Sequence, residues 1–389
     1  MGCLRRPLES DETFGRGSTA PLFDSAAETN IETAAAREMR GVGAPLLWLS
    51  AHLPPPRAPH VLSLELVALP EHERFLEQSA LSVPPAGLRE VCTLLAARGH
   101  TLVLPGADAS IHPLLVPLAR SPTDSEVVGL LRWPGASGGG TQLPLVRTAG
   151  AQLELLASCA EHYLARQLVL ADEAEPADPD ELGVLEALAA SRGIRYERGA
   201  AARSPGGVPG YVITRVGPFI QEYERLAAGH LAKGAEQAGL VACERSQQCF
   251  GAWGRPLAFH AQVLYDLGRR EEARDMARQA LEMPLWTLGT PLDQVLAIAE
   301  RTIDELVDRV QLKADGKLTM EQLRANNGME ERSPQQICKD RATYVMDLVV
   351  AAPETHDWTS TRPKLASLYK EAEMGAVASF ISLEPTPKK

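Results

Sequence analysis

The sequence has few of the features that mark an enzyme, a membrane protein or a nucleic-acid-binding protein. Its 389 residues contain no apolar run close to the ~18 to 20 residues that a membrane-spanning helix needs. The nine histidines are dispersed, and none lies in an HExxH metal motif or beside a GxSxG nucleophile motif. A net charge of −11 disfavours non-specific binding to nucleic acid or to an anionic membrane surface. We therefore expect no direct membrane span, no nucleic-acid partner and no catalytic residues.

Cofactor motifs are lacking as well. The six cysteines are scattered, without a CxxC or Cys/His metal spacing, so we expect free thiols in a reducing compartment. The Gly-rich run 135–140 (GASGGG) lacks the Lys-Ser/Thr pair of a phosphate-binding loop. The run 313–323 (KADGKLTMEQL) resembles the second half of an EF-hand, but Gln322 stands where the bidentate acid belongs. These absences predict that the protein binds no metal, no nucleotide and no other cofactor.

What the sequence does contain is a helical repeat between Phe219 and Gly289. Two pairs of helices follow one another at an offset of 34 residues (268 − 234), which is the spacing of a tetratricopeptide unit. Each pair has a small residue on either helix, where the two must approach closely, and a Gly at the turn. The corresponding residues are Leu226-Ala227 and His260-Ala261, Gly234 and Gly268, and Gly239 and Ala273. A third pair near the end of the sequence has Leu365, Ala366, Tyr369 and Ala378 at matching positions.

These patterns predict an α+β protein in which a mixed α/β domain precedes an all-α, tetratricopeptide-like domain of helical hairpins. The boundary is placed near 198–218, because a Gly/Pro-rich run stands there and strand patterning is lost after Val216. The predicted parts are a flexible tail or targeting remnant at 1–44, the mixed domain at 45–217, the helical domain at 218–382 and a C-terminal tail at 383–389. The opening Met-Gly-Cys leaves open whether the N-terminus is cleaved or acylated.

Local patterns also predict individual elements. Strands are expected at 61–69, 101–104 and 211–216, with a hairpin formed by 126–133 and 143–147. Helices are expected at 87–98, 151–170, 179–191, 292–312, 315–326 and 333–350. The helix at 179–191 has the clearest beginning, with Asp178 as N-cap and Pro179 at the first helical position.

Several segments carry a family resemblance. They are SPTDSEVVGLLRWP (121–134), WGRPLAFHAQVLYDLGRREEARDMARQALEMPLWTLG (253–289), SPQQICKDRATYVMDLV (333–349) and RPKLASLYKEAEMGAVASF (362–380). Over about 120–382 the chain resembles a plastid-targeted family of tetratricopeptide-like proteins of plants and algae, most strongly at 251–289. The resemblance implies a plastid protein and a scaffold rather than an enzyme.

The favoured function is therefore a non-enzymatic protein–protein interaction scaffold of the plastid, in the stroma or on the stromal face of the thylakoid. The resemblance implies protein partners that are subunits of a thylakoid complex, such as a photosystem. The protein would be an assembly factor or a bound accessory subunit of that complex. Two alternatives stay open, an enzyme with an unrecognised site in the α+β domain and a helical-repeat RNA-binding protein.

In tandem repeats of this kind the first helix of each pair lines a groove. The partner-binding candidates on these helices are Gln221, Glu224, Leu231, Arg255, Gln262 and Tyr265. They do not form the Lys/Asn/Arg clamp that binds the carboxylate of a chaperone C-terminus. For Tyr265 the alternative is a core position against the predicted helix 292–312.

Overall fold

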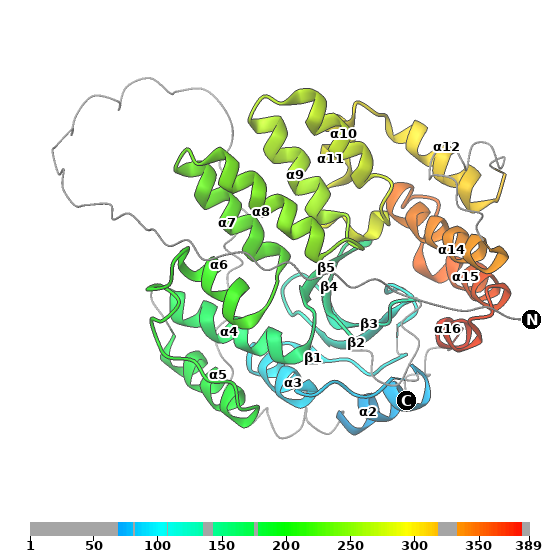
Figure 1. The fold of residues 1–389 in the computed structure, drawn as a ribbon. Helices are drawn as coiled ribbons and strands as arrows, with labels where there is room; N and C mark the ends of the chain where they lie inside the picture. The colour runs from blue at the N-terminus through cyan, green and yellow to red at the C-terminus, as the bar shows by residue number, and fades with distance from the viewer. Residues whose placement is uncertain are drawn as a thin grey trace, which may run out of the picture. The chain divides into compact units, whose positions relative to one another are not determined.

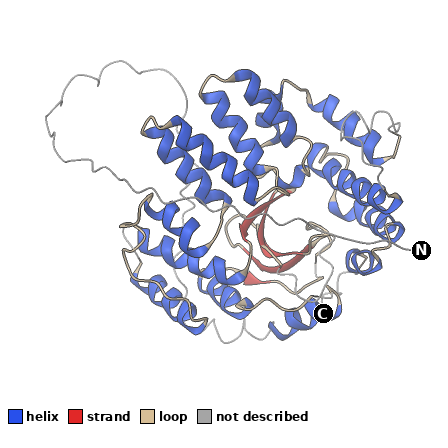
Figure 2. Cartoon of the chain, in the orientation of Figure 1, coloured by secondary structure: helices blue, strands red, loops and turns tan. Residues whose placement is uncertain are grey.

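The structure is a computed structural model that describes residues 69–80, 82–106, 108–134, 143–174, 178–317 and 333–382. All of these residues lie in the unit Leu53–Lys389. They form an α+β fold, in which a small antiparallel sheet with its helices is followed by a long succession of helices (Figures 1 and 2). No described residue after Ala157 lies in a strand. The α+β fold class predicted from the sequence is confirmed.

The sheet is an antiparallel meander in which each strand pairs with the next along the chain. Its strands are β1 (Thr101–Leu102), β2 (Leu115–Arg120), β3 (Val127–Leu131), β4 (Leu145–Ala149) and β5 (Gln152–Ala157). Every residue of β3 is buried, because both faces of the sheet are covered. Gly129 of β3 lies opposite Pro117, where the register shifts. A Cβ at Gly129 would lie 2.4 Å from the carbonyl oxygen of Val116, so only glycine fits this close approach.

The helices of the first part of the chain are α2 (Leu69–Gln78), α3 (Leu88–Ala97), α4 (Ala160–Glu173), α5 (Pro179–Ser191), α6 (Gly207–Tyr211) and the π-helix η3 (Val212–Val216). Helices α3 and α4 pack against the sheet, and α5 and α6 pack against these helices or the segments beside them. Helix α5 begins as predicted, because the carboxylate of Asp178 accepts the backbone N–H groups of Asp180 and Glu181. The predicted helix at 87–98 and the predicted hairpin are confirmed by α3 and by the β3–β4 pair.

The remaining helices follow as antiparallel hairpins and connecting segments (Figure 1). They are α7 (Ile220–Ala232), α8 (Glu236–Cys249), α9 (Arg255–Asp266), α10 (Arg270–Ala280), the 3-10 helix η4 (Leu285–Thr287), α11 (Leu292–Ala299), α12 (Ile303–Ala314), α14 (Pro334–Ala351), α15 (Trp358–Glu371) and α16 (Gly375–Ile381). The hairpins are α7 with α8, α9 with α10, and α15 with α16. None of the described helices is both long enough and apolar enough to span a membrane.

The three hairpins share one turn geometry. Gly234, Gly268 and Glu373 occupy the same turn position and have φ values of 71°, 78° and 60°. This left-handed conformation ends the first helix of each pair, and glycine adopts it without steric cost. At the helix crossings, Ala227 and Ala261 have no exposed surface. The repeat read from the sequence therefore corresponds to recurring helix pairs in the structure.

The prediction of a helix over 151–170 is wrong for the first half of that range. Residues Gln152–Ala157 form strand β5, and α4 begins only at Ala160. Along β5 the buried and half-buried side chains alternate with a period of two, as in a strand with one face inward. The residues that face inward are Leu153, Leu155 and Ala157, whereas Leu156, which the helix prediction placed inward with Leu153, lies on the other face of the strand.

Two further expected elements need correction. Segment 211–216 is the end of α6 followed by the π-helix η3, rather than a strand. Only Val212 is buried in η3, so its β-branched residues do not line a sheet face. The expected helix 292–312 is divided into α11 and α12, because Glu300 takes a left-handed conformation with a φ of 53°.

Some expectations fall outside the described residues. These are the tails at 1–44 and 383–389, most of the expected strand 61–69, the Gly-rich run 135–140 and residues 318–326. Leu69, at the end of the expected strand, is the first residue of α2.

Candidate functional site

The first helices of the two tandem hairpins, α7 and α9, are joined to strand β5 by a network of polar side chains. Arg255 donates to both carboxylate oxygens of Glu224, at 2.8 and 2.9 Å, in the bidentate geometry that guanidinium groups favour. A third N–H of Arg255 reaches Glu154 on β5 at 3.2 Å. Gln221 of α7 donates to Glu154 at 3.1 Å and to the carbonyl of Leu155 at 2.7 Å. Gln221 thus occupies a backbone acceptor of β5, the last strand of the meander.

The electrostatics of this network keep Arg255 and Glu154 charged. Burial lowers the pKa of Arg255, but the carboxylates of Glu224 and Glu154 raise it by more, so that the pKa lies above its ordinary value. Burial raises the pKa of Glu154, but Arg255 and Arg147 lower it by more, so that this carboxyl stays ionised. A buried ion pair whose groups are fully hydrogen-bonded fixes orientation more than it adds stability. The network therefore holds α7 and α9 in a set position against the sheet.

The six predicted partner-binding residues fall into two groups in the structure. Gln221, Glu224 and Arg255 belong to the network just described and have partners within the chain. Leu231, Gln262 and Tyr265 lie further along their helices. The sequence could not show the first group's partners, because Glu154 is separated from Arg255 by about a hundred residues of chain.

The second group differs in exposure. Leu231 is half-buried and packs beside Gly239 of α8, where a Cβ would come within 2.8 Å of it. Gln262 donates to Asp266 at 2.8 Å. Tyr265 is 38% exposed, and the guanidinium of Arg270 lies 3.4 Å from the centre of its ring. Tyr265 is thus a surface residue of α9 rather than a core residue.

A second ion-pair network, which the sequence did not reveal, connects α4 with α7. Glu222 has no exposed surface and accepts from Arg166 of α4 at 2.9 Å and from Arg225 at 3.1 Å. Nη2 of Arg225 also donates to both carboxylate oxygens of Glu173, at the end of α4, at 2.7 and 2.8 Å. The guanidinium of Arg166 lies 5.1 Å from the ring centre of Phe219, just before α7. The only signal in the sequence was a glutamate on the apolar side of a helix.

Aromatic rings form the centre of the contact between the sheet and the later helices. Trp286 of η4 lies 5.1 Å from Trp133, 6.5 Å from Trp253 and 4.8 Å from His112, measured between ring centres. His112 also lies 4.6 Å from Trp358 at the start of α15. Aromatics make up only 5% of the sequence, and four of its five tryptophans meet here. These rings join the sheet, the middle helices and the C-terminal helices in one core.

A buried carboxyl group holds the turn that carries Trp286. Asp347 of α14 is 3% exposed, and its Oδ1 accepts the backbone N–H of Leu285 at 2.7 Å. Burial raises the pKa of Asp347 to about 8. Burial and the nearby charge of Arg362 lower the pKa of His112 to about 3. Near neutral pH both side chains are therefore uncharged in the folded protein.

We predict a pH dependence of stability that is due to Asp347. In the unfolded chain its carboxyl ionises near pH 4, whereas in the folded protein it stays protonated up to about pH 8. Its stabilising contribution is therefore full below pH 4 and is lost as the pH rises through 8. His112 acts in the opposite direction, but only below its unfolded pKa of 6.5. Between pH 6.5 and 8, wild type should lose about 2 kcal/mol relative to Asp347→Asn, which cannot ionise.

The measurement is urea unfolding of both proteins at several pH values, with the comparison made on their difference. Asparagine keeps an acceptor for the N–H of Leu285, so the variant is close in shape to the protonated aspartic acid. Parallel pH profiles for the two proteins would show that Asp347 is already ionised in the folded state.

The arrangement closest to a catalytic one lies at the start of α4. Cys159 caps this helix, and His162 on its first turn bonds to Ser158 at 3.0 Å. Burial raises the pKa of Cys159, but hydrogen bonds with His162 and the charge of its ring lower it by more, so that the pKa lies below its ordinary value. The ring of His162 is covered by Gly217, where a Cβ would come within 2.7 Å, and Cys159 is 8% exposed. This packing leaves little room for a substrate beside the pair.

Within the described ranges, no three or more His, Cys, Asp or Glu side chains are grouped so that they could hold a metal ion.

Comparison with known families accounts for nearly all of the described chain. Residues 70–214 match the family described as PAB N-terminal, residues 220–302 the PAB middle domain and residues 312–384 the PAB C-terminal domain. The chain therefore belongs to the PAB family. It is similar to the Arabidopsis thaliana protein named "Protein IN CHLOROPLAST ATPASE BIOGENESIS, chloroplastic", with 31% identity over 314 residues. The similarity covers 80% of this chain and 90% of that protein. No solved structure matches the chain.

The resemblance stated from the sequence is thus confirmed as far as a plastid protein family, while its tetratricopeptide-like part remains a prediction.

The contacts described above connect all three matched regions. Arg166 with Glu222 joins the N-terminal and middle regions, and Asp347 with Leu285 joins the middle and C-terminal regions. The edge-to-face contact of His112 with Trp358 joins the N-terminal and C-terminal regions.

Proposed function

We propose that this chain is a non-enzymatic protein-binding factor that acts in the biogenesis of the chloroplast ATPase. The observation that carries the proposal is the similarity over 90% of a protein whose name assigns it to that process. Since the similarity covers 90% of the relative and 80% of this chain, the two proteins correspond over most of their lengths. Among thylakoid complexes, the name favours the ATPase over a photosystem. It also favours an assembly factor over a permanent accessory subunit. The name specifies only the chloroplast; within it, the stroma or the stromal face of the thylakoid is our proposal.

For the binding surface we propose the tetratricopeptide-like groove formed by α7 and α9. The structure supplies two supporting features. The network around Arg255 fixes both helices against the sheet, so a partner would meet a preformed surface and little ordering would be needed on binding. The outer part of α9 presents Tyr265 with Arg270 against its ring, and both are residue types enriched at binding hot spots. In this proposal Arg255 positions the two helices, whereas Tyr265 and Gln262 contact the protein partner.

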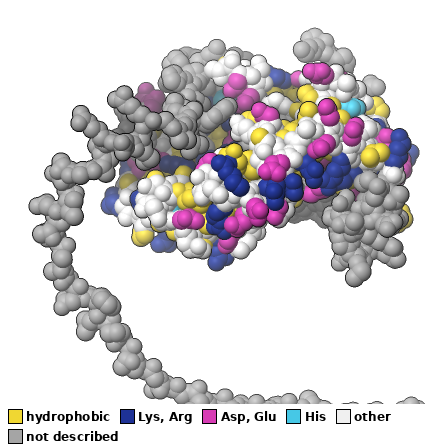
Figure 3. All heavy atoms as spheres, turned by 90° about the horizontal axis from the view of Figure 1, so that it is seen from above, with side chains coloured by type: hydrophobic (Ala, Val, Ile, Leu, Met, Phe, Trp, Pro, Cys, Tyr) yellow, Lys and Arg dark blue, Asp and Glu magenta, His cyan; other side chains and the backbone are white. Residues whose placement is uncertain are grey.

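The surface charge also suits a protein partner. On the face that looks upward in Figure 1, acidic and basic side chains are interspersed with small apolar patches (Figure 3). Nucleic-acid-binding surfaces instead carry a continuous basic stripe. A mixed surface of this kind is typical of protein interfaces with a polar rim.

The test is affinity purification of the tagged chain from chloroplasts, followed by mass spectrometry of the recovered proteins. Wild type is expected to recover ATPase subunits. Tyr265→Ala should lower that recovery at least about tenfold, as expected for a hot-spot residue, and leave the melting temperature nearly unchanged. The matched control is Val184→Ala on α5, an apolar side chain of similar exposure (36% against 38%) in the N-terminal region.

Recovery of every wild-type partner in full by Tyr265→Ala would exclude the groove as the binding surface. Absence of ATPase subunits from the wild-type sample would contradict the proposed function itself.

A further inference from the structure

The second helix of the second hairpin, α10, has three arginines in a row. Arg270, Arg274 and Arg278 stand four residues apart, so they follow one another along the helix axis at steps of roughly 6 Å. The first is exposed and the other two are half-buried. At the far end of the row, Arg278 donates to the carbonyl of Ala299, the last residue of α11, at 3.1 Å. We call these three residues the α10 arginine row, and it lies within the middle family region.

The guanidinium of Arg270 is held flat against Tyr265 of α9. Its central carbon lies 3.4 Å from the centre of the ring, and two planar groups fit at this distance only when they are nearly parallel. Stacking uses the face of the guanidinium and leaves the N–H groups at its edge free. Among the described residues the Arg270 side chain makes no hydrogen bond and no ion pair. Its donors are therefore both oriented and unused.

The other two arginines of the row have weak partners. Arg274 lies 3.5 Å from the carboxylate of Glu300 and 3.9 Å from that of Asp275. These two acidic side chains are 66% and 67% exposed, so solvent screens both pairs, and a partner can replace them at little cost. Within the described ranges no carboxylate pairs with Arg278, which keeps further N–H groups beyond its one bond to α11.

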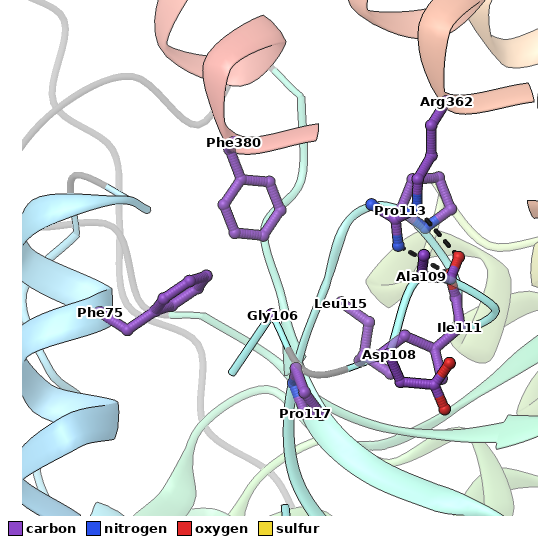
Figure 4. A pocket seen from close by; sticks show the side chains of 10 residues that line it. All are labelled: Phe75, Gly106, Asp108, Ala109, Ile111, Pro113, Leu115, Pro117, Arg362 and Phe380. Atoms are coloured by element: carbon purple, nitrogen blue, oxygen red, sulfur yellow. Dashed lines mark hydrogen bonds between the residues drawn. The ribbon is translucent and has the colours of Figure 1, made fainter. Parts of the chain in front are cut away.

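A half-buried arginine of α15 shows how the chain satisfies such a cation internally. Arg362 also has no carboxylate partner among the described residues, but it donates to the carbonyls of Ala109 and Ile111 at 3.0 Å each (Figure 4) and of Ile381 at 3.2 Å. No described acceptor does the same for Arg270. Its edge therefore remains open to a partner.

A planar guanidinium with free edge donors fits a carboxylate through two parallel hydrogen bonds. We propose that the α10 arginine row binds an acidic segment of a protein partner, with carboxylates one helical turn apart and one of them on Arg270. The inference rests on the proposed function, because Tyr265 belongs both to this contact and to the α7–α9 groove. It adds the chemistry that the partner presents to this surface.

The charges around the row favour a short acidic segment over a long polyanion. Glu271 and Asp275 each follow a row arginine and point about 100° away from it around the helix. These carboxylates and the net charge of −11 repel a nucleic acid or an anionic membrane along its length. A segment no longer than the row meets mainly the three arginines, because charges beyond about 8 Å are screened at physiological ionic strength.

The test is fluorescence anisotropy of four labelled probes with the full chain. They are an alanine-based helical peptide of about 16 residues with glutamate at every fourth position, its glutamine analogue, a single-stranded oligothymidylate and vesicles that contain phosphatidylglycerol. The glutamate peptide is expected to bind at least about tenfold more tightly than the glutamine peptide, because only its carboxylates form charge-assisted bonds to the row. Equal affinities, or no binding of the glutamate peptide, would overturn the proposal. Tighter binding of the oligonucleotide or the vesicles than of the glutamate peptide would assign the row to phosphate groups and would also overturn it.

A row variant locates the binding. It combines Arg270→Gln, Arg274→Gln and Arg278→Gln, and it should lower the affinity for the glutamate peptide to that for the glutamine peptide. If this variant fails to fold, Arg270→Gln alone decides, because that side chain has no described hydrogen bond to lose. The single change should weaken the glutamate peptide about fivefold. An unchanged affinity in whichever of the two variants folds shows that the peptide binds elsewhere.

A control variant has the same change in net charge. It combines Arg89→Gln, Arg195→Gln and Arg215→Gln, three exposed arginines earlier in the chain whose side chains form no described ion pair. It should bind the glutamate peptide like wild type. If it loses the preference for glutamate as the row variant does, the effect is one of overall charge and the proposal is wrong.

Failure of this inference and failure of the proposed function are distinguishable. If Tyr265→Ala loses the ATPase subunits in the chloroplast purification and the row variant recovers them in full, the groove is the binding surface and the acidic segment is wrong. If wild type prefers the glutamate peptide but recovers no ATPase subunits, the chemistry of the row holds and the proposed function fails.

Discussion

Replacing Trp286 by alanine is expected to lower the free energy of unfolding by about 3 to 5 kcal/mol, the range for a large aromatic truncated in a core. Trp286 is 2% exposed and contacts three other aromatic side chains from separate parts of the chain. The turn that carries it is held from α14 by Asp347. Its loss should therefore loosen the sheet, the middle helices and the C-terminal helices together. Urea denaturation followed by circular dichroism measures the effect.

The matched control is Trp286→Phe. Phenylalanine keeps an aromatic ring and removes the indole N–H, which is buried without a partner among the described residues. Removing an unpaired buried donor offsets part of the lost packing, so we expect less than half the alanine effect. Equal destabilisation by the two substitutions would show that the exact indole shape, rather than ring packing, holds this core.

Replacing Glu222 by glutamine is expected to cost a similar amount, about 3 to 5 kcal/mol. The glutamate has no exposed surface and stands between Arg166 and Arg225. Without its charge, the buried guanidinium of Arg166 loses its only described carboxylate partner. The cost comes from leaving that charge uncompensated rather than from the net worth of the ion pair. Thermal and urea unfolding of the variant provide the measurement.

Glu173→Gln is the control for this network. Glu173 also pairs with Arg225, but its side chain is 36% exposed, so solvent screens the interaction. We expect a loss below about 1 kcal/mol. The double variant Glu222→Gln, Arg166→Met should recover part of the stability, because it removes the unpaired charge as well. If Glu222→Gln unfolds like wild type, then α4 and α7 are not coupled through this pair.

The helical hairpins could be predicted because their determinants are local. A glycine at a left-handed turn and small residues at a helix crossing stand at fixed offsets, and both can be read along the sequence. In the third hairpin Glu373 takes the turn position with a positive φ, and the surrounding apolar pattern still identified the pair. The N-cap at Asp178 was predictable for the same reason.

Strand β5 and the π-helix η3 could not be predicted, because their conformations are decided by packing. Leu153 and Leu155 are inward on a strand only because β4 lies beside them. Val212 is buried against α4 and α6, whereas the residues after it in η3 are not, so β-branched composition did not give a strand. Tertiary context overrides local preference in segments of this length.

The candidate site was predicted only in outline. The sequence placed Arg255 and Tyr265 on the first helix of the second pair, and α9 contains both residues, while their role in partner binding stays a prediction. It could not show that Glu154 and Glu224 bind Arg255, because such ion pairs join residues distant in sequence. For the same reason the sequence could not show that Arg362 binds the backbone carbonyls of Ala109, Ile111 and Ile381.

The central claim is that the chain acts in the biogenesis of the chloroplast ATPase. Its most direct test is to express the chain, with a chloroplast targeting sequence, in an Arabidopsis thaliana line that lacks the 31% identical relative. The measurement is the amount of assembled ATPase on native gels, with photosystem amounts as the internal reference. The account predicts that the chain restores the ATPase towards the wild-type level and leaves the photosystems unchanged. If the chain accumulates in the chloroplast and the ATPase stays at the level of the mutant line, the claim is contradicted.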